Sequence, residues 1–331
     1  MNTGKIRLLV LVAGVAAAVS FAASGSPGPS IYLKNVVTGT PHQALMAIAF
    51  DKTTGVAVGA AGEIENSTDG GATWKADPSP TPLSLLGVDI HNDLSIAVGQ
   101  MGLVVVRDRG TQWVKKDTGT TERLLNVSIN SEGNAVAVGS FGTVLESTDR
   151  GGTWNSIAPE WGSLMKDQGD QFMPHMYAAH IDDAGTITVA GELGCILQSR
   201  DGGKSWAVVH HGDSASHNEE ESLFSMDFRS DGVAFAVGQN GRILRSANGG
   251  ATWQVSDSNV RSNLLSIHSS ANGEIVVTGM YSMLVSNNDG KTWNTVRDQE
   301  IGSGWYAGVA RSAGGANYAV GKAGSILKVN F

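Results

Sequence analysis

A short glycine motif recurs seven times along this chain and constrains its fold more than any other feature. The motif reads AVGAAG at 57–62 and AVGSFG at 137–142, with close variants elsewhere. Its first glycine falls at Gly59, Gly99, Gly139, Gly191, Gly238, Gly279 and Gly321. Most copies lie about 41 residues apart, and Ser282 replaces the second glycine of the sixth copy. A period of this length is typical of repeat architectures in which each copy forms one structural unit.

A second motif follows each of the first six glycine motifs. It reads STDGGATW at 67–74, and the copy at 106–113, VRDRGTQW, is degenerate. We expect a tight turn in which Asp or Asn accepts hydrogen bonds from backbone N–H groups two residues on, and glycine takes positive φ. The Asp or Asn and the Trp of each box are Asp69 and Trp74, Asp108 and Trp113, Asp149 and Trp154, Asp201 and Trp206, Asn248 and Trp253, and Asn288 and Trp293. Their regular placement indicates a structural role.

Alternating apolar residues precede the glycine motifs, as in Met46, Ile48 and Phe50. A period of two predicts a strand, and each unit then holds four strands, which is the content of a propeller blade. The seventh unit stops before a tryptophan box, so it lacks an outer strand that the segment 31–37 can supply. The sequence therefore predicts an all-β, seven-bladed β-propeller of four-stranded blades, closed by an N-terminal strand in the last blade.

The N-terminus has the layout of a secretory signal peptide. Lys5 and Arg7 precede an apolar run at 8–19, and small residues follow it. We expect residues 1–23 to be the signal and 24–331 to form a single propeller in the periplasm or an equivalent compartment. The run is shorter than the roughly 20 residues that span a bilayer, although a membrane anchor stays open as the alternative. Cys195 is the single cysteine, so no disulfide can form within the chain.

Composition excludes several kinds of function. The chain has 23 basic and 31 acidic residues and a formal charge of −8, which disfavours nucleic acid as a partner. With 41% hydrophobic residues the chain can form a core. Although 43 residues are glycine, each glycine motif joins two expected strands and opens no helix. We therefore expect no phosphate-binding loop and no cofactor.

Alternating strand directions place the glycine turns on one face of the ring, together with the connections between units. These connections include the two longest, 155–173 and 207–222. Loops on a rigid scaffold often carry function, so we expect partner binding on this face. The candidate residues are Met101, Phe141, Trp161, Glu192, Leu193, Gln239, Arg261, Met280 and Tyr281. Packing between blades competes as an explanation for the apolar members, and a small core beneath the loop competes for Trp161.

The tryptophan motifs resemble the Asp-box, or bacterial neuraminidase repeat. Combined with the glycine turns, they make residues 44–331 resemble the photosystem II stability/assembly-factor family, which includes members in non-photosynthetic bacteria. The resemblance implies a propeller without catalysis that helps to assemble or stabilise a membrane protein complex. It also associates bacterial members with exporters of the resistance–nodulation–division type. It identifies no partner, because the shared motifs specify the fold.

The sequence also contains features typical of metal binding and of carbohydrate hydrolysis. Five histidines lie between 175 and 217 near acidic residues, but their spacing matches no known ligand set, so we expect no metal. A sialidase-like or other carbohydrate-binding or carbohydrate-hydrolysing protein is the alternative function, because Asp-boxes occur in such proteins. A sialidase needs clustered arginines, and only Arg123, Arg261 and Arg297 fall on the plausible working face. We therefore expect a protein that is not an enzyme.

Overall fold

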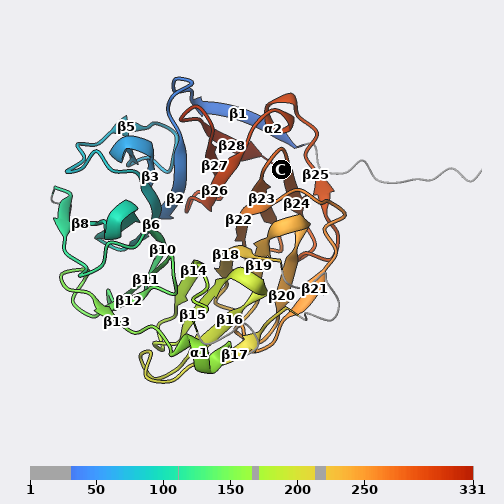
Figure 1. Cartoon of the computed structure of the whole chain (residues 1–331). Coiled ribbons are helices and arrows are strands. Elements are labelled where there is room, and N and C mark those ends of the chain that lie inside the picture. Colours follow the sequence, from blue (N-terminus) through green and yellow to red (C-terminus); the bar gives the residue numbers. More distant parts are fainter. Residues whose placement is uncertain (1–30, 111, 166–170, 213–220, 331) are drawn as a thin grey trace, which may run out of the picture. The chain divides into compact units, whose positions relative to one another are not determined.

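The computed structural model describes residues 31–110, 112–165, 171–212 and 221–330. These residues form seven antiparallel sheets of four strands each, arranged as blades around a central axis (Figure 1). The predicted seven-bladed propeller is confirmed. The expected signal peptide lies outside the described residues.

Blades 1 to 6 each take four consecutive strands, ordered from the central axis outwards. Blade 1 contains β2 (Leu45–Asp51), β3 (Thr54–Gly59), β4 (Ile64–Ser67) and β5 (Lys75–Ala76). Blade 2 contains β6 (Leu85–His91), β7 (Leu94–Gly99), β8 (Val104–Asp108) and β9 (Val114–Lys116). Blade 3 contains β10 (Leu124–Ile129), β11 (Ala135–Gly139), β12 (Val144–Ser147) and β13 (Asn155–Ser156).

The second half of the ring repeats this order. Blade 4 contains β14 (Met176–Ile181), β15 (Ile187–Gly191), β16 (Ile196–Ser199) and β17 (Ala207–His210). Blade 5 contains β18 (Leu223–Phe228), β19 (Ala234–Gly238), β20 (Ile243–Ser246) and β21 (Gln254–Ser256). Blade 6 contains β22 (Leu264–Ser269), β23 (Ile275–Gly279), β24 (Met283–Ser286) and β25 (Asn294–Thr295). Two four-residue helices, α1 (Trp161–Leu164) and α2 (Gln299–Gly302), lie in the connections that follow blades 3 and 6.

Blade 7 is built from both ends of the described chain. It contains β26 (Tyr306–Arg311), β27 (Asn317–Gly321) and β28 (Ile326–Asn330), and β1 (Tyr32–Val37) pairs antiparallel with β28 as its outer strand. The predicted closure by the segment 31–37 is confirmed. Val36 and Val37 pack against a core group that joins blade 7 to blade 1 and includes Leu45 and Tyr318. The closing strand therefore stabilises the contact at which the ring is sealed.

The core lies between neighbouring blades, because each sheet is packed on both faces. The second strand of each blade is consequently apolar or small at almost every position, and β7 is buried throughout. Bulky core residues such as Ile96 and Leu124 from adjacent blades share one cluster with Trp154, the tryptophan of the third box. The box tryptophans thus contribute to packing between blades, as their regular spacing predicts.

The first glycine of each glycine motif is required by a close approach of backbone to backbone. Gly238 has extended backbone (φ −167°), but a Cβ atom there would lie 1.9 Å from the carbonyl oxygen of Ser222. A Cβ atom at Gly139 would likewise lie 2.1 Å from the carbonyl oxygen of Arg123. No larger residue fits at these positions without moving the innermost strand of the blade.

The Asp-boxes form the expected tight turns, but their hydrogen bonds differ from our expectation. In the third box the Asp149 carboxylate accepts hydrogen bonds from the backbone N–H and the hydroxyl of Thr153, four residues on (both 2.8 Å). The Ser147 hydroxyl accepts one from the N–H of Gly151 (2.9 Å), which has positive φ. The turn from Asp149 to Thr153 therefore spans five residues, and the aspartate at its start is hydrogen-bonded to the threonine at its end.

The sixth glycine turn is altered, as Ser282 predicts. Ser282 is buried, and its backbone φ is not positive, unlike that of the second glycine in the other turns. Instead, Tyr281 donates its backbone N–H to the carbonyl of Gly304 (2.8 Å), and Met280 forms an isolated bridge with Trp305. This turn is therefore fastened to the connection that follows its own blade.

Candidate partner-binding face

The glycine turns and the connections between blades meet at one end of the ring, which we call the glycine-turn face. Contacts between the two sets of loops define it. Gly102 donates its N–H to the carbonyl of Glu122 (2.8 Å), and Gly142 donates to that of Pro174 (2.8 Å). Because each connection packs directly on a turn, the face is a rigid platform.

Each glycine turn presents one residue in the left-handed backbone region at its tip. These residues are Ala61, Met101, Phe141, Leu193, Asn240, Tyr281 and Ala323, with φ between 51° and 58°. A left-handed backbone at a non-glycine residue is uncommon, and its recurrence here comes from the shared turn. The side chains of Met101, Phe141 and Tyr281 are 65%, 60% and 61% exposed. Large apolar side chains therefore project into solvent at three of the seven tips.

The remaining candidates from the sequence are divided between surface and interior. Met280, Gln239 and Arg261 are exposed. Trp161 is only 6% exposed, and its indole N–H donates to the carbonyl of Gly142 (3.0 Å), so it supports the glycine turn from beneath.

Two further candidates lie in the fourth glycine turn. Leu193 packs against the same core cluster as Trp161. The Glu192 carboxylate accepts the backbone N–H of His175 (2.8 Å) and fastens the turn to the connection that precedes β14. Of these two side chains, neither projects freely as the Phe141 ring does.

A row of aromatic rings, which the sequence reasoning missed, runs from the tip of blade 3 toward the central axis. Phe141 lies edge-on against His175 (ring centroids 4.9 Å apart), His175 lies near Tyr177 (6.4 Å), and Tyr177 meets Phe224 of the next blade (5.3 Å). The backbone N–H of Phe141 also donates to Nδ1 of His175 (3.2 Å). We call these four residues the aromatic row.

The aromatic row ends on a ring of apolar residues at the glycine-turn end of the innermost strands. Each ring residue is the second residue of its innermost strand, where the register shifts, and each is half-buried. The ring consists of Met46, Leu86, Leu125, Tyr177, Phe224, Leu265 and Ala307. The sequence contains the signal for this ring, because six of the seven innermost strands have a large apolar or aromatic residue at this position and the seventh has alanine.

A cleft of about 520 Å³ lies beside the aromatic row, between the turns of blades 2 and 3. Met101 and Phe141 flank it, and Arg123, Glu122 and His175 contribute polar groups. The cleft, the aromatic row and the apolar ring together form an open, mixed surface that suits a polypeptide segment better than a small enclosed substrate.

The central channel holds several ionisable groups. Two of them, the half-buried aspartates Asp89 and Asp227, accept hydrogen bonds from the neighbouring blades. Asp89 accepts the N–H of Ile129 on the next blade (2.7 Å) and that of Ile90 (2.8 Å). Asp227 accepts the N–H and the hydroxyl of Ser269 on the next blade (both 2.6 Å). These carboxylates satisfy backbone groups on the inner edges of neighbouring blades, which is a structural role.

The two aspartates differ in their ionisation. Burial raises the pKa of Asp89 to about 7, although the N–H groups of Ile129 and Ile90 favour its charged form. Burial also opposes ionisation of Asp227, but His268 and the hydrogen bonds from Ser269 outweigh it and lower the pKa of that carboxyl. Asp89 is therefore the aspartate of the channel whose charge changes near neutral pH.

Asp89→Asn should change how stability depends on pH. Because the pKa of Asp89 is raised in the folded state, its contribution to stability is fully present below about pH 4 and is lost as the pH rises to about 7. The variant cannot ionise, so its free energy of unfolding relative to wild type should increase by on the order of 2–4 kcal/mol between pH 5 and pH 8. Urea denaturation of both proteins at the two pH values measures this change. An equal difference at both pH values would contradict it.

Within the described residues, no group of three or more His, Cys, Asp or Glu side chains could hold a metal ion. His217 and the acidic residues at 219 and 220 belong to the histidine-rich region noted in the sequence, and they lie outside the described residues. Among described residues, no helix combines the length and apolar composition needed to cross a bilayer.

No family model matches the sequence, and no curated protein does either. Several solved structures share this fold over about nine tenths of the chain. A structure of YCF48 from Cyanidioschyzon merolae superposes with a TM-score of 0.70 at 17% identity, covering 89% of this chain and 98% of that one. YCF48 bound to D1 peptide gives 0.68 at 17% identity, covering 91% and 95%. This chain has a YCF48-like propeller fold. A streptogramin B lyase also superposes (TM-score 0.72, 13% identity, covering 91% and 97%), so the shared fold alone does not determine an activity.

Proposed function

We propose that this protein is a non-catalytic, exported scaffold that binds an exposed segment of a membrane protein complex through its glycine-turn face. The aromatic row carries the proposal. It forms a continuous path from the exposed Phe141 ring to the apolar ring around the channel, on a face already held rigid by hydrogen bonds between loops. A preformed surface of this kind binds with little ordering cost to the scaffold.

Two further considerations support the proposal. The likeness to YCF48 bound to D1 peptide shows that a propeller of this shape can hold a peptide. The basic and apolar N-terminal segment supports export to the periplasm, where soluble domains meet the exposed loops of membrane proteins. Sialidase-like or other carbohydrate chemistry remains the alternative function, and the streptogramin B lyase is an enzyme with this fold.

The double variant Phe141→Ser/Tyr281→Ser should lose most of its partner binding. It removes two exposed anchors from opposite parts of the face, and loss of such anchors typically costs 2 kcal/mol or more, about 30-fold in affinity. The measurement is chemical crosslinking in membranes of the source organism, followed by capture and mass spectrometry.

A matched control is the double variant Val114→Ser/Val255→Ser. These valines are 50% and 56% exposed on the outer strands β9 and β21, and neither belongs to a glycine turn. The control should capture the same membrane protein as wild type. Undiminished capture by a folded Phe141→Ser/Tyr281→Ser protein would refute the proposed face, and hydrolysis of a fluorogenic sialoside would favour the alternative function.

A further inference from the structure

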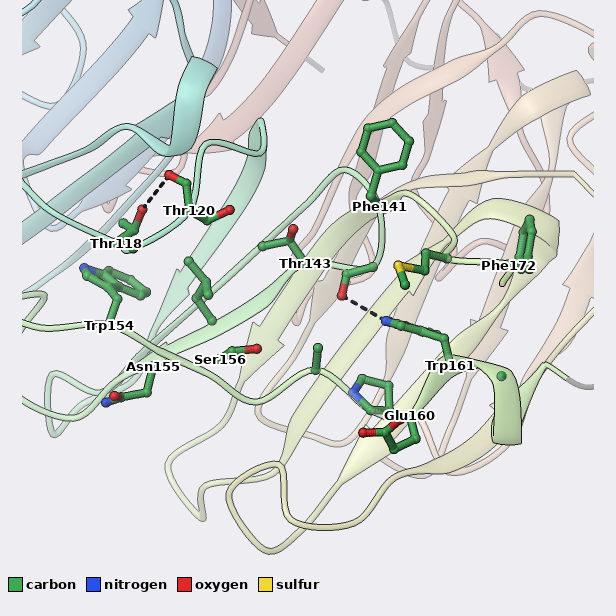
Figure 2. Close-up of a pocket in the computed structure, with 17 residues that line it drawn as sticks. Thr118, Thr120, Phe141, Thr143, Trp154, Asn155, Ser156, Glu160, Trp161 and Phe172 are labelled. Atoms are coloured by element: carbon green, nitrogen blue, oxygen red, sulfur yellow. Dashed lines mark hydrogen bonds between the residues drawn. The ribbon is translucent and has the colours of Figure 1, made fainter. Parts of the chain in front are cut away.

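A second cleft lies at the outer edge of blade 3, and Phe141, the first residue of the aromatic row, forms part of its lining. Its volume is about 720 Å³ (Figure 2). The outer strand β13 and the residues after it form one side, the 118–120 connection forms a second, and Trp161, Phe172 and Met173 of the inserted connection form a third. We call it the edge cleft.

The edge cleft contains a free strand edge. Within the part of the chain that the structure describes, β13 pairs only with β12, with Ser156 opposite Leu145. The next residue, Ile157, donates its N–H to the carbonyl of Val144 (2.9 Å). In an antiparallel pair, alternate residues direct their peptide groups toward the partner strand and away from it. Because Ile157 is bonded inwards, Ser156 directs its N–H and C=O groups outwards. Ser156 lines the cleft.

The walls suit a polypeptide better than a sugar ring. Trp154 and Trp161 are buried, and their indole N–H groups donate to the carbonyls of Gly151 (3.2 Å) and Gly142 (3.0 Å), so neither ring is a free stacking platform. The apolar wall that reaches solvent is instead formed by Met173, which is 53% exposed, and Phe141, which is 60% exposed and packs edge-on against His175. An extended chain can place side chains against such a wall while its backbone pairs with an edge.

The charge of the cleft selects among peptides. Glu160 is the one ionisable side chain among its described lining residues, and it is exposed. An acidic segment would be repelled there, whereas a lysine or arginine could pair with the carboxylate. The molecule already completes one blade by strand addition, because β1 pairs with β28 from almost 300 residues away in sequence.

We propose that the edge cleft binds an extended, basic segment of a partner protein as an additional strand on β13. This binding site lies outside the apolar ring and shares only Phe141 with the aromatic row, so it goes beyond the proposed function.

The test uses proline to remove a backbone donor without removing the strand. Ser156→Pro eliminates the outward N–H of an edge position, where proline is tolerated, and Ser156→Ala is the matched control that keeps the N–H. Linear 12-residue peptides selected by phage display on the whole protein serve as the probe, and their dissociation constants are measured by fluorescence anisotropy. We expect peptides rich in Lys or Arg whose dissociation constant rises at least 10-fold with Ser156→Pro and less than 2-fold with Ser156→Ala.

Two further measurements keep the proposal testable if the proline variant folds poorly. Glu160→Lys should weaken the basic peptides at least 5-fold, and bound peptide should slow hydrogen exchange at the amide of Ser156 in the wild-type protein. Equal affinity for the proline and alanine variants, unchanged exchange at the Ser156 amide, selection of acidic peptides, or binding of neutral glycans in place of peptides would each overturn the proposal.

The two proposed surfaces can fail separately. Tyr281→Ser in blade 6 should leave peptide binding at the edge cleft unchanged. Ser156→Pro should likewise leave capture of the membrane complex by the glycine-turn face unchanged.

Discussion

Gly238→Ala should destabilise the protein by about 3 kcal/mol or more, although it adds a single methyl group. The new Cβ would lie 1.9 Å from the carbonyl oxygen of Ser222 and 2.9 Å from the Cα of Leu223. Both are backbone atoms of the connection and strand that lead into the same blade, so no side-chain rotation can relieve the overlap. Thermal and urea denaturation measure the effect, and Gly238→Val should be recovered mainly as insoluble protein.

Two other glycines separate this overlap from the general effects of replacing glycine. A Cβ atom added at Gly302 would have no other atom within 4 Å, and the backbone φ there is not positive. The stability of Gly302→Ala should therefore stay within about 0.5 kcal/mol of wild type. A Cβ atom added at Gly249 would also have no other atom within 4 Å, but the backbone φ there is +66°. Gly249→Ala should therefore lower the free energy of unfolding by roughly 1–2 kcal/mol through backbone strain alone. If Gly238→Ala proved no more harmful than Gly249→Ala, close approach would not be the reason for the first glycine of the motif.

The sequence was sufficient to predict the fold because the repeat expresses the architecture directly. A motif that recurs at a constant period, joined to period-two strands, leaves few arrangements other than a ring of similar sheets. Even the closure by β1 followed, since a seventh unit without an outer strand and a strand without a unit complete one another. The altered turn at Ser282 was predictable in the same way, as a departure from an otherwise constant pattern.

The site was predictable only where a side chain's position follows from the turn itself. Phe141 and Tyr281 occupy the same left-handed position at the tips of equivalent turns, and both are exposed, whereas Leu193 at this position packs against the core. Trp161 lies in an inserted connection that no other blade shares, and its burial beneath Gly142 depends on a path that the repeat does not encode. The aromatic row was missed for a similar reason, because its contacts join residues from three blades and two kinds of loop.

The hydrogen bonds of the Asp-box show where local rules fail. Asp and Asn commonly bond to the backbone two residues on, and this rule gave the wrong partner for Asp149. The serine at the start of the box accepts the earlier N–H, that of Gly151, so the carboxylate accepts the N–H and hydroxyl of Thr153 instead. The motif contains both residues, but its letters do not specify which acceptor serves which donor.

A chain that begins at Thr38 and so lacks β1 should lose about 4 kcal/mol of stability and associate with itself. Removing β1 eliminates its pairing with β28 along five residue positions and exposes the edge of β28. It also removes Val36 and Val37 from the core group at the contact between blades 1 and 7. An unpaired edge strand pairs readily with other chains, so light scattering should show oligomers alongside a melting temperature lower by about 10 °C.

The matched control for this truncation is a chain that begins at Ile31, which retains the whole of β1 and should melt as the full-length protein does. A synthetic peptide covering residues 31–37, added to the truncated chain, should restore part of the lost melting temperature, because it can occupy the vacant position beside β28. Unchanged melting and a monomeric truncated chain would show that the ring is held closed by the contact between blades 1 and 7 alone. In that case β1 would only cover an edge, and the closing contribution would belong to Leu45, Ile48 and Tyr318.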